Sequence, residues 1–226
     1  MSPDLIQYLN QRFDVSSRPP KASAAPFVTI SRETGCHSFR IATLLHQRLE
    51  SLMLVKWNIV TKEIIKSAMR ELELDQQQVA SILRAQERSH FTEIMKAFEH
   101  SSYKSDERVR EILKEFIQNL ARNGYVIIVG RAGSIVTNKI KSGLHLRLIA
   151  PLNWRIQSIM AQKNMNRIQA RKYILESDEA RMKLMQDFFK KQPASSHWDI
   201  TVDNSRLSDE EIVEILITVL QKRNMI

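Results

Sequence analysis

The sequence predicts a three-layer α/β fold, in which a parallel sheet carries helices on both faces. Two observations lead to this prediction. Short apolar runs rich in β-branched residues, which suit buried strands, recur along the chain. Longer segments between them carry apolar residues at helical spacing. Strands that alternate with helices favour parallel pairing through helical crossovers.

The first strand–loop–helix unit organises the chain. Phe27–Ile30 predicts a central strand, residues 31–38 a loop at its carboxyl end, and the apolar spacing from Phe39 onward a helix. A loop in this position directs backbone N–H groups and a helix N-terminus toward one point, which is an arrangement that binds phosphate. The regular nucleotide-binding pattern GxxxxGK[ST] does not occur in the chain.

The remaining elements are predicted from the same patterns. A strand is predicted at Met53–Val60, then a polar helical segment over 61–102 with Thr61 as a candidate N-cap, and then a helix at Ser105–Ala121. Strands at Tyr125–Val129 and His145–Ile149 follow, and two basic helices lie within 153–192, divided near Asn164–Asn166. The last elements are a strand at Trp198–Asp203 and a helix that begins with the capping box Ser208–Glu211. Residues 1–26 predict a short helix and a proline- and alanine-containing linker, and residues 27–226 one domain.

The composition narrows the class of protein. Thirty-four Lys and Arg residues against twenty-five acidic residues give a net charge of +9. This excess indicates either simple solubility or an anionic partner, which can be nucleotide phosphate or nucleic acid. Cys36 is the single cysteine, which excludes an internal disulfide and a cysteine-based zinc site and favours a reducing compartment. The six histidines lack metal-ligand spacing, so no protein-built metal site is predicted.

Targeting signals also limit the classes of protein that the sequence allows. The N-terminus lacks the apolar core of a signal peptide, and no window reaches the length of a membrane span. We therefore expect a cytoplasmic protein without a membrane partner.

Several stretches resemble a known family. The resemblance rests on five stretches: the loop Ser31-Arg32-Glu33-Thr34-Gly35, the turn Gly130–Gly133, the segment Leu146–Pro151 leading to Trp154–Ile156, the helical Asp178–Lys183, and Thr201–Asn204. In order and spacing they resemble the cytidylate-kinase-like branch of the P-loop nucleoside monophosphate kinases, over roughly Phe27 to Leu220. No single motif is specific, but five in this order are fairly specific together.

The resemblance implies a P-loop NTPase-like fold with two helical inserts, residues 61–102 covering the acceptor nucleotide and residues 153–192 forming a basic lid. It implies transfer of the γ-phosphoryl group of ATP to CMP, dCMP or a similar small acceptor, with Mg²⁺ held mainly by the nucleotide. Nucleotides are then the expected partners and nucleic acid is not. The alternative is a catalytically weakened relative that binds a nucleotide or a partner as a regulatory module.

The resemblance also assigns residues to roles. Phosphoryl transfer needs in-line positioning and positive charge around the transferred group rather than covalent help from the protein. The implied ATP-binding residues are Ser31, Arg32, Gly35, His37, Ser38 and Arg40, the implied acceptor-binding residues are Glu33 and Arg131, and the implied catalytic cations of the lid are Arg155, Arg181 and Lys183.

The chain departs from the family pattern at the loop. After the glycine that corresponds to Gly35, the family pattern continues with Ser-Gly-Gly-Arg. This chain has Cys36-His37-Ser38-Phe39 at those four positions, and Arg40 follows one residue later. Two glycines are absent where backbone passes close to phosphate, so the residues in their place need suitable φ and ψ. A loop that only keeps the geometry of the fold is the alternative. Ala132 and Thr61 stand where the family commonly has aspartate.

Single residues at the site have plainer interpretations as well. Cys36 suits a small buried space-filler better than a redox sensor. His37 suits an exposed loop residue without a ligand, and Arg131 a salt-bridged arginine at the sheet edge. Asp178 stands three residues before Arg181, so the two can simply pair along a helix.

Overall fold

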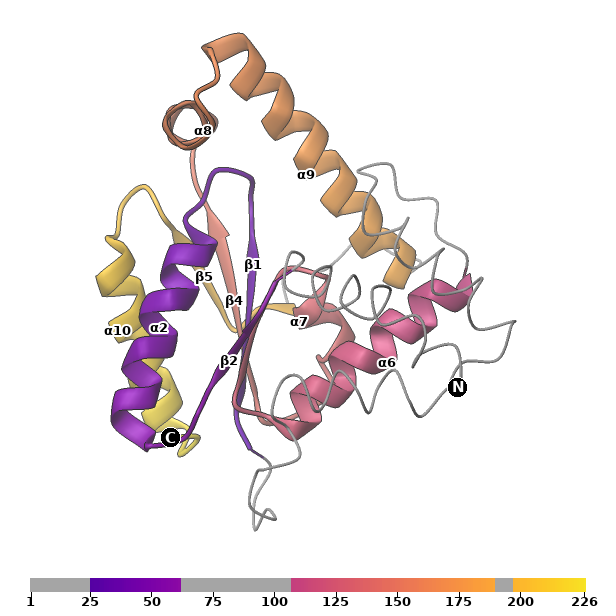
Figure 1. Ribbon diagram of the computed structural model, residues 1–226, viewed down its shortest axis with the longest axis vertical. Coiled ribbons are helices and arrows are strands. Elements are labelled where there is room, and N and C mark those ends of the chain that lie inside the picture. Colours follow the sequence, from indigo (N-terminus) through magenta and orange to yellow (C-terminus); the bar gives the residue numbers. More distant parts are fainter. Residues whose placement is uncertain (1–24, 62–106, 190–196) are drawn as a thin grey trace, which may run out of the picture.

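The structure is a computed structural model that describes residues 25–61, 107–189 and 197–226 (Figure 1). The predicted N-terminal helix, most of the linker, and the helical segment at 62–102 lie outside the described residues.

All five strands of the described residues belong to one parallel sheet. They are β1 Phe27–Arg32, β2 Asn58–Val60, β3 Val126–Val129, β4 Gly143–Ile149 and β5 Ile200–Asp203. Their order across the sheet is β2-β3-β1-β4-β5, and every pairing is parallel. The prediction of a parallel sheet with the first strand at its centre is confirmed. The carboxyl ends of the strands therefore meet at one edge, where such folds bind ligands.

Helices of the described residues cover both faces of the sheet. They are α2 Ser38–Met53, α6 Glu107–Asn123, α7 Gly133–Val136, α8 Leu152–Lys163, α9 Arg167–Phe189 and α10 Asp209–Lys222. Figure 1 shows α2 and α10 side by side on one face and α6 with α7 on the other. The three-layer prediction is confirmed. The pair α8 and α9 rises beyond the carboxyl edge of the sheet, in the place of the predicted lid.

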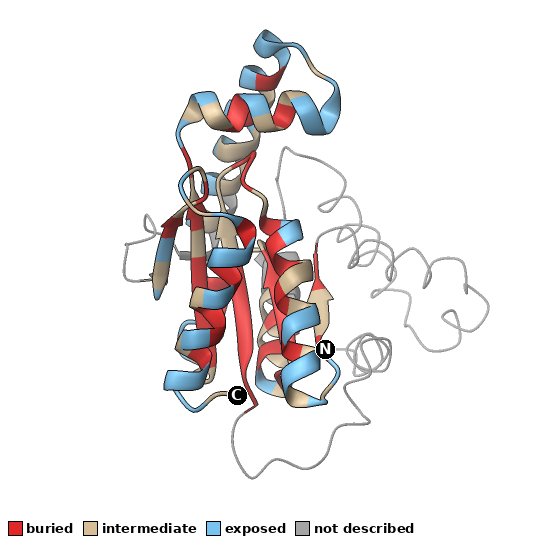
Figure 2. Ribbon diagram, turned by 90° about the vertical axis from the view of Figure 1, so that its left-hand side faces the viewer, coloured by how far each residue is buried: buried red, intermediate tan, exposed pale blue. Residues whose placement is uncertain are grey.

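The main core lies between the sheet and the α2/α10 layer. Val28 and Ile30 of β1 pack there against Ile41 and Leu45 of α2, and all four side chains are fully buried. Figure 2 shows buried residues along the strands and exposed residues on the outer sides of the helices. Because side chains alternate along a strand, the intervening residue Thr29 belongs to the opposite face. That face is more polar near the sheet centre, where Thr29 Oγ1 lies 2.8 Å from Nδ1 of His145, its partner on β4.

Element boundaries differ from the prediction mainly around the second strand. The apolar run from Met53 does not form one strand, because α2 continues to Met53 and Leu54 ends it with a left-handed φ of 52°. Leu54 is 95% exposed, so this apolar residue closes a helix rather than filling a strand. Only Asn58–Val60 joins the sheet. The short helix α7 was not predicted, because its four residues are too few to show a period.

Two predicted helix ends are confirmed in detail. Asn164 takes a left-handed conformation at the end of α8, which divides the basic segment into two helices. Ser208 caps α10, since its hydroxyl accepts from the Glu211 N–H while the Glu211 carboxylate accepts from the Ser208 N–H. This capping box fixes the first turn of α10 close to the β1–α2 loop.

Candidate functional site

The loop between β1 and α2 depends on one glycine. Gly35 has a φ of +101°, and a Cβ at this position would lie 2.9 Å from both Cβ and the carbonyl oxygen of Arg155. Only glycine fits such a φ beside another backbone without strain. His37, the N-cap of α2, has an ordinary φ of −81°. The loss of the later glycines therefore leaves the loop unstrained.

Backbone donors of the loop bind acceptors supplied by the chain itself. The Thr34 N–H donates to Asp178 Oδ1 at 2.8 Å, and the His37 N–H donates to Asn204 Oδ1 at 2.8 Å. The Cys36 N–H donates to the Glu33 carbonyl at 3.2 Å. N–H groups of this kind hold phosphate in nucleotide-binding loops. In this structure a carboxylate and an amide oxygen take two of them.

A cluster formed by Thr34, Arg155, Asp178 and Arg181, called here the Asp178 cluster, joins the loop to α8 and α9. Asp178 Oδ1 accepts from the Thr34 N–H, from the Thr34 hydroxyl at 2.6 Å, and from Arg181 Nη1 at 3.0 Å. Asp178 Oδ2 accepts from Arg155 Nη1 at 2.7 Å. Arg181 also donates to the Thr34 hydroxyl. One oxyanion is thus held by a backbone N–H, a hydroxyl and two guanidinium groups.

Arg155 is the buried arginine of this cluster, at 9% exposure. Besides Asp178, it donates to the Ala150 carbonyl at 3.0 Å and to the Thr34 carbonyl at 3.3 Å. Its Nε also lies 3.3 Å from a carboxylate oxygen of Glu33, and that oxygen accepts from the Ala150 N–H. Arg155 therefore connects the first turn of α8 to the loop.

His37 and Arg40 face the N-terminus of α10. His37 Nδ1 lies 3.2 Å from Asp209 Oδ1, and Arg40 Nε lies 3.0 Å from Asp209 Oδ2. Asp209 is buried, whereas Arg40 is exposed and also approaches Glu210. His37 is half-buried rather than exposed, because α10 brings a carboxylate to it and its ring packs on Trp154. Whether it binds a ligand stays a prediction.

Ser31 and Arg32 contact the turn that follows the neighbouring strand β3. Ser31 Oγ is 3.3 Å from Ser134 Oγ, and the Arg32 guanidinium lies where a Cβ on Gly130 would have to be. Gly130 has a φ of +78°, which side chains with a Cβ rarely adopt, so glycine suits this turn. Arg131, the next residue, has a φ of 57° in the turn before α7.

Ser38 and Lys183 differ sharply in burial. Ser38, the first residue of α2, is buried. Lys183 is exposed on α9 and takes no part in the Asp178 cluster. The structure therefore brings together Glu33, Gly35, Arg155 and Arg181, and leaves Lys183 apart from them.

Cys36 behaves as a space-filler. It is buried in the main core, and burial, reinforced by the Glu33 carboxylate, raises the pKa of its thiol to about 12. A thiol with this pKa is protonated at neutral pH and unreactive. The plainer interpretation is confirmed.

Three residues of the site were not assigned from the sequence. Thr34 and Asn204 contact the loop through partners far along the chain. Asp178 was considered only as a partner of Arg181, and that pair is present at 3.0 Å. Its position three residues before a lid arginine was the available signal. The contact with Thr34 was not visible, because it joins residues that are distant in sequence.

The parallel sheet with the order β2-β3-β1-β4-β5, covered by helices on both faces, defines a three-layer α/β protein. A model of the cytidylate kinase-like family matches residues 27–206. The chain belongs to the cytidylate kinase-like family.

Solved structures and a curated relative were also compared. An uncharacterized protein from Eubacterium ventriosum has a TM-score of 0.60 at 14% identity, covering 87% of this chain and 98% of that one. Shikimate kinase from Bacteroides thetaiotaomicron has a TM-score of 0.49 at 12% identity, covering 87% and 98%. Uronate isomerase from Corynebacterium glutamicum is 21% identical over 98 residues, 43% of this chain, which spans 19% of the length of that relative.

Among the helices in the three described ranges, none has the length and apolar character needed to cross a bilayer.

Proposed function

We propose that the protein is a kinase-type phosphotransferase that binds ATP with Mg²⁺ at the β1–α2 loop and transfers its γ-phosphoryl group to CMP, dCMP or a similar small acceptor. The observation that carries this proposal is the Asp178 cluster. Its carboxylate is held by the types of donor that hold phosphate oxygens, at the carboxyl end of the central strand. Asp178 therefore serves as a stand-in anion for testing the fit of a phosphate.

The residues fit a phosphate in charge only in place of Asp178. Arg155 and Arg181 carry two positive charges to the loop, which Asp178 and Glu33 now balance, so a phosphate that replaces the Asp178 carboxylate meets both guanidinium groups. When bound, ATP supplies the activated phosphoryl group, with Mg²⁺ held mainly by its phosphates. The two arginines would bind and orient phosphate oxygens, and the Thr34 N–H would donate a further hydrogen bond. Glu33 and Arg131 are the proposed contacts to the acceptor.

The second candidate is a catalytically weakened member that binds a nucleotide without efficient transfer. A specific observation favours it: the loop contains no lysine, and His37 and Arg40 already contact Asp209. Fewer cations then remain for the transferred group. Phosphoryl transfer depends strongly on alignment, while binding tolerates a looser fit.

The experiment that separates the two candidates combines ATP calorimetry with a coupled transfer assay over all nucleoside monophosphates. Arg181→Gln removes a cation of the cluster. Arg48→Gln is the matched control, since Arg48 pairs with Glu214 on the exposed α2/α10 surface. We expect ATP binding and transfer in the wild type, with ATP affinity reduced about tenfold or more only in Arg181→Gln.

The outcomes are distinct. ATP binding with no transfer to any monophosphate would establish the second candidate. Absence of ATP binding at millimolar concentration would refute both.

A further inference from the structure

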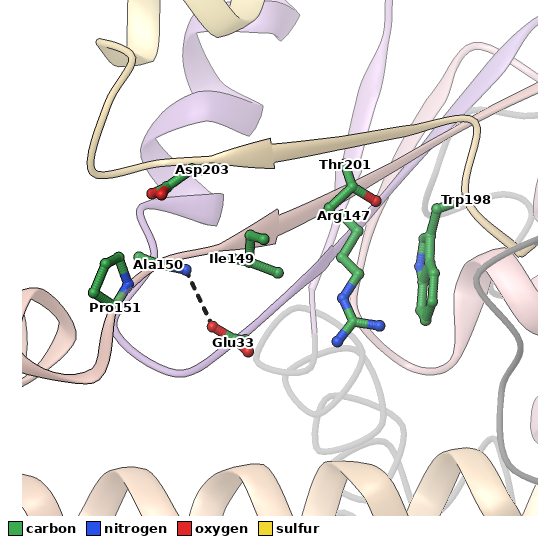
Figure 3. Close-up of a pocket in the computed structure, with 8 residues that line it drawn as sticks. All are labelled: Glu33, Arg147, Ile149, Ala150, Pro151, Trp198, Thr201 and Asp203. Atoms are coloured by element: carbon green, nitrogen blue, oxygen red, sulfur yellow. Dashed lines mark hydrogen bonds between the residues drawn. The ribbon is translucent and has the colours of Figure 1, made fainter.

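A second candidate site lies beside the loop, on the sheet face opposite the main core. A cavity of about 640 Å³ is bordered there by Glu33, Arg147, Ala150, Trp198, Thr201 and Asp203 (Figure 3). Ligand pockets for small molecules typically measure roughly 300–1,000 Å³. The cavity is thus large enough for a ligand of nucleotide size. It adjoins the Asp178 cluster through Glu33, which pairs with Arg155, and the edge of the main core through Ala150.

Arg147 is the cation of this cavity. It lies on β4 between the core residues Leu146 and Leu148, so strand alternation directs it to the opposite face. Its guanidinium carbon lies 4.2 Å from the ring centroid of Trp198. No carboxylate of the described residues forms an ion pair with it. A half-buried guanidinium that packs on an indole face keeps its N–H edges for a further acceptor.

Trp198 also has an unused donor. Its indole Nε1 is buried and has no hydrogen-bond partner in the described part of the chain. Buried N–H groups normally have a partner, and leaving one unpaired costs free energy. Because this N–H is not accessible to solvent, it does not reach a ligand in the cavity, and the Arg147 guanidinium is the donor at this end.

The two carboxylates of the cavity are already compensated. Glu33 accepts from the Ala150 N–H and lies 3.3 Å from Arg155. Asp203 accepts from the N–H and hydroxyl of Ser205, and these hydrogen bonds lower the pKa of its carboxyl group. Figure 3 shows Asp203 at the end of the cavity away from Arg147. The lining therefore has an uncompensated cation at one end and acceptors toward the other.

We propose that this cavity binds a small molecule that carries an oxyanion, either phosphate or carboxylate, together with hydroxyl or amino groups. The Arg147 guanidinium, held on the Trp198 ring, anchors the oxyanion. The hydroxyl or amino groups donate to Glu33 and Asp203. The inference does not depend on ATP binding at the loop, although Glu33 places the ligand beside it.

The test uses three probes with the full chain. CMP carries a phosphate, gluconate carries a carboxylate with hydroxyls, and cytidine lacks the oxyanion. Binding is followed by tryptophan emission and by calorimetry in the wild type, in Arg147→Gln and in the surface control Arg48→Gln. Trp198→Phe identifies the emission signal that comes from the cavity. Thermal melts of each variant report folding.

We expect CMP or gluconate to bind the wild type and change its emission, and the probe that does so identifies the oxyanion. Because CMP is also the acceptor of the proposed function, CMP binding is assigned to this cavity only where Trp198→Phe removes the emission change and Arg147→Gln weakens the binding. Arg147→Gln should weaken that probe about tenfold or more, because it loses hydrogen bonds from a charged donor. Cytidine binding and ATP affinity should be the same in Arg147→Gln and in the wild type. Trp198→Phe should lose the emission change.

Equal affinity of Arg147→Gln and the wild type for both anionic probes would overturn the proposal. So would the absence of any response of the wild type to either probe at millimolar concentration. If the wild type does not bind ATP, the proposed function is refuted, but the binding of an oxyanion in this cavity is not.

Discussion

Replacing Asp178 by asparagine tests whether its carboxylate competes with phosphate. The substitution keeps the shape of the side chain and one oxygen, which can still accept from the Thr34 N–H. It removes the charge that pairs with Arg155 at 2.7 Å and with Arg181 at 3.0 Å. If a phosphate uses the same donors, removal of the internal anion should raise the affinity for ATP while lowering the stability of the free protein.

The magnitude follows from the contacts that are lost. A hydrogen bond to a charged group contributes roughly 1.5–3 kcal/mol, and the more buried contact, to Arg155, accounts for most of the effect. A loss of about 2 kcal/mol would lower Tm by roughly 4–8 °C for a chain of this size. If the Asp178 carboxylate no longer competes with the phosphate for the arginines, the same free energy corresponds to an increase in ATP affinity of up to about thirtyfold.

The assay is thermal denaturation with and without ATP, together with calorimetric titration of ATP. Glu179→Gln is the matched control, since it removes the same charge from the next residue of α9, which is exposed. A variant Asp178→Asn that loses both stability and ATP affinity would refute the competition. Asp178 would then be a residue that holds the arginines in place for the nucleotide.

Three further predictions concern the loop and its supports. Gly35→Ala should destabilise the fold by about 2–3 kcal/mol, measured by urea denaturation, because its φ is +101° and its Cβ would meet Arg155; unchanged stability would show that the loop can rearrange. Cys36 should react with thiol reagents at about pH 8 only after unfolding, because its pKa is raised to about 12, and a fast reaction in the native state would contradict its burial. Ser208→Ala should cost about 1 kcal/mol of stability in the same denaturation assay through loss of the capping box, whereas exposed Ser51→Ala should change little.

Much of the fold could be predicted because its strands are apolar on both faces. Val126–Val129 is buried at every residue, so its run of four apolar residues marks a strand without any alternation. The segment after α2 was harder, since Leu54 is apolar in sequence but exposed in the structure. An apolar residue that caps a helix cannot be distinguished from a strand residue by pattern alone.

The site could be predicted only in part. The family pattern singled out Arg155 and Arg181, and both converge on the loop. The directions of His37 and Arg40 could not be read from the loop, because Asp209 reaches them from a helix about 170 residues further along the chain. Their partner depends on how α10 packs against α2, which is a tertiary property.

The position of Asp178 and Arg181 on one helix limits how a phosphate could enter the cluster. The two residues are three apart on α9, and both contact Thr34. A movement of α9 away from the loop would withdraw the carboxylate, but it would also withdraw the Arg181 guanidinium. A phosphate that keeps Arg181 must therefore displace Asp178 by rotation of the aspartate side chain while the helix stays near the loop. Arg155 comes from α8 and is fixed by the Ala150 carbonyl, so it can remain in place during this exchange. The exchange is then local, and its free energy is the difference between two anions bound to the same two arginines.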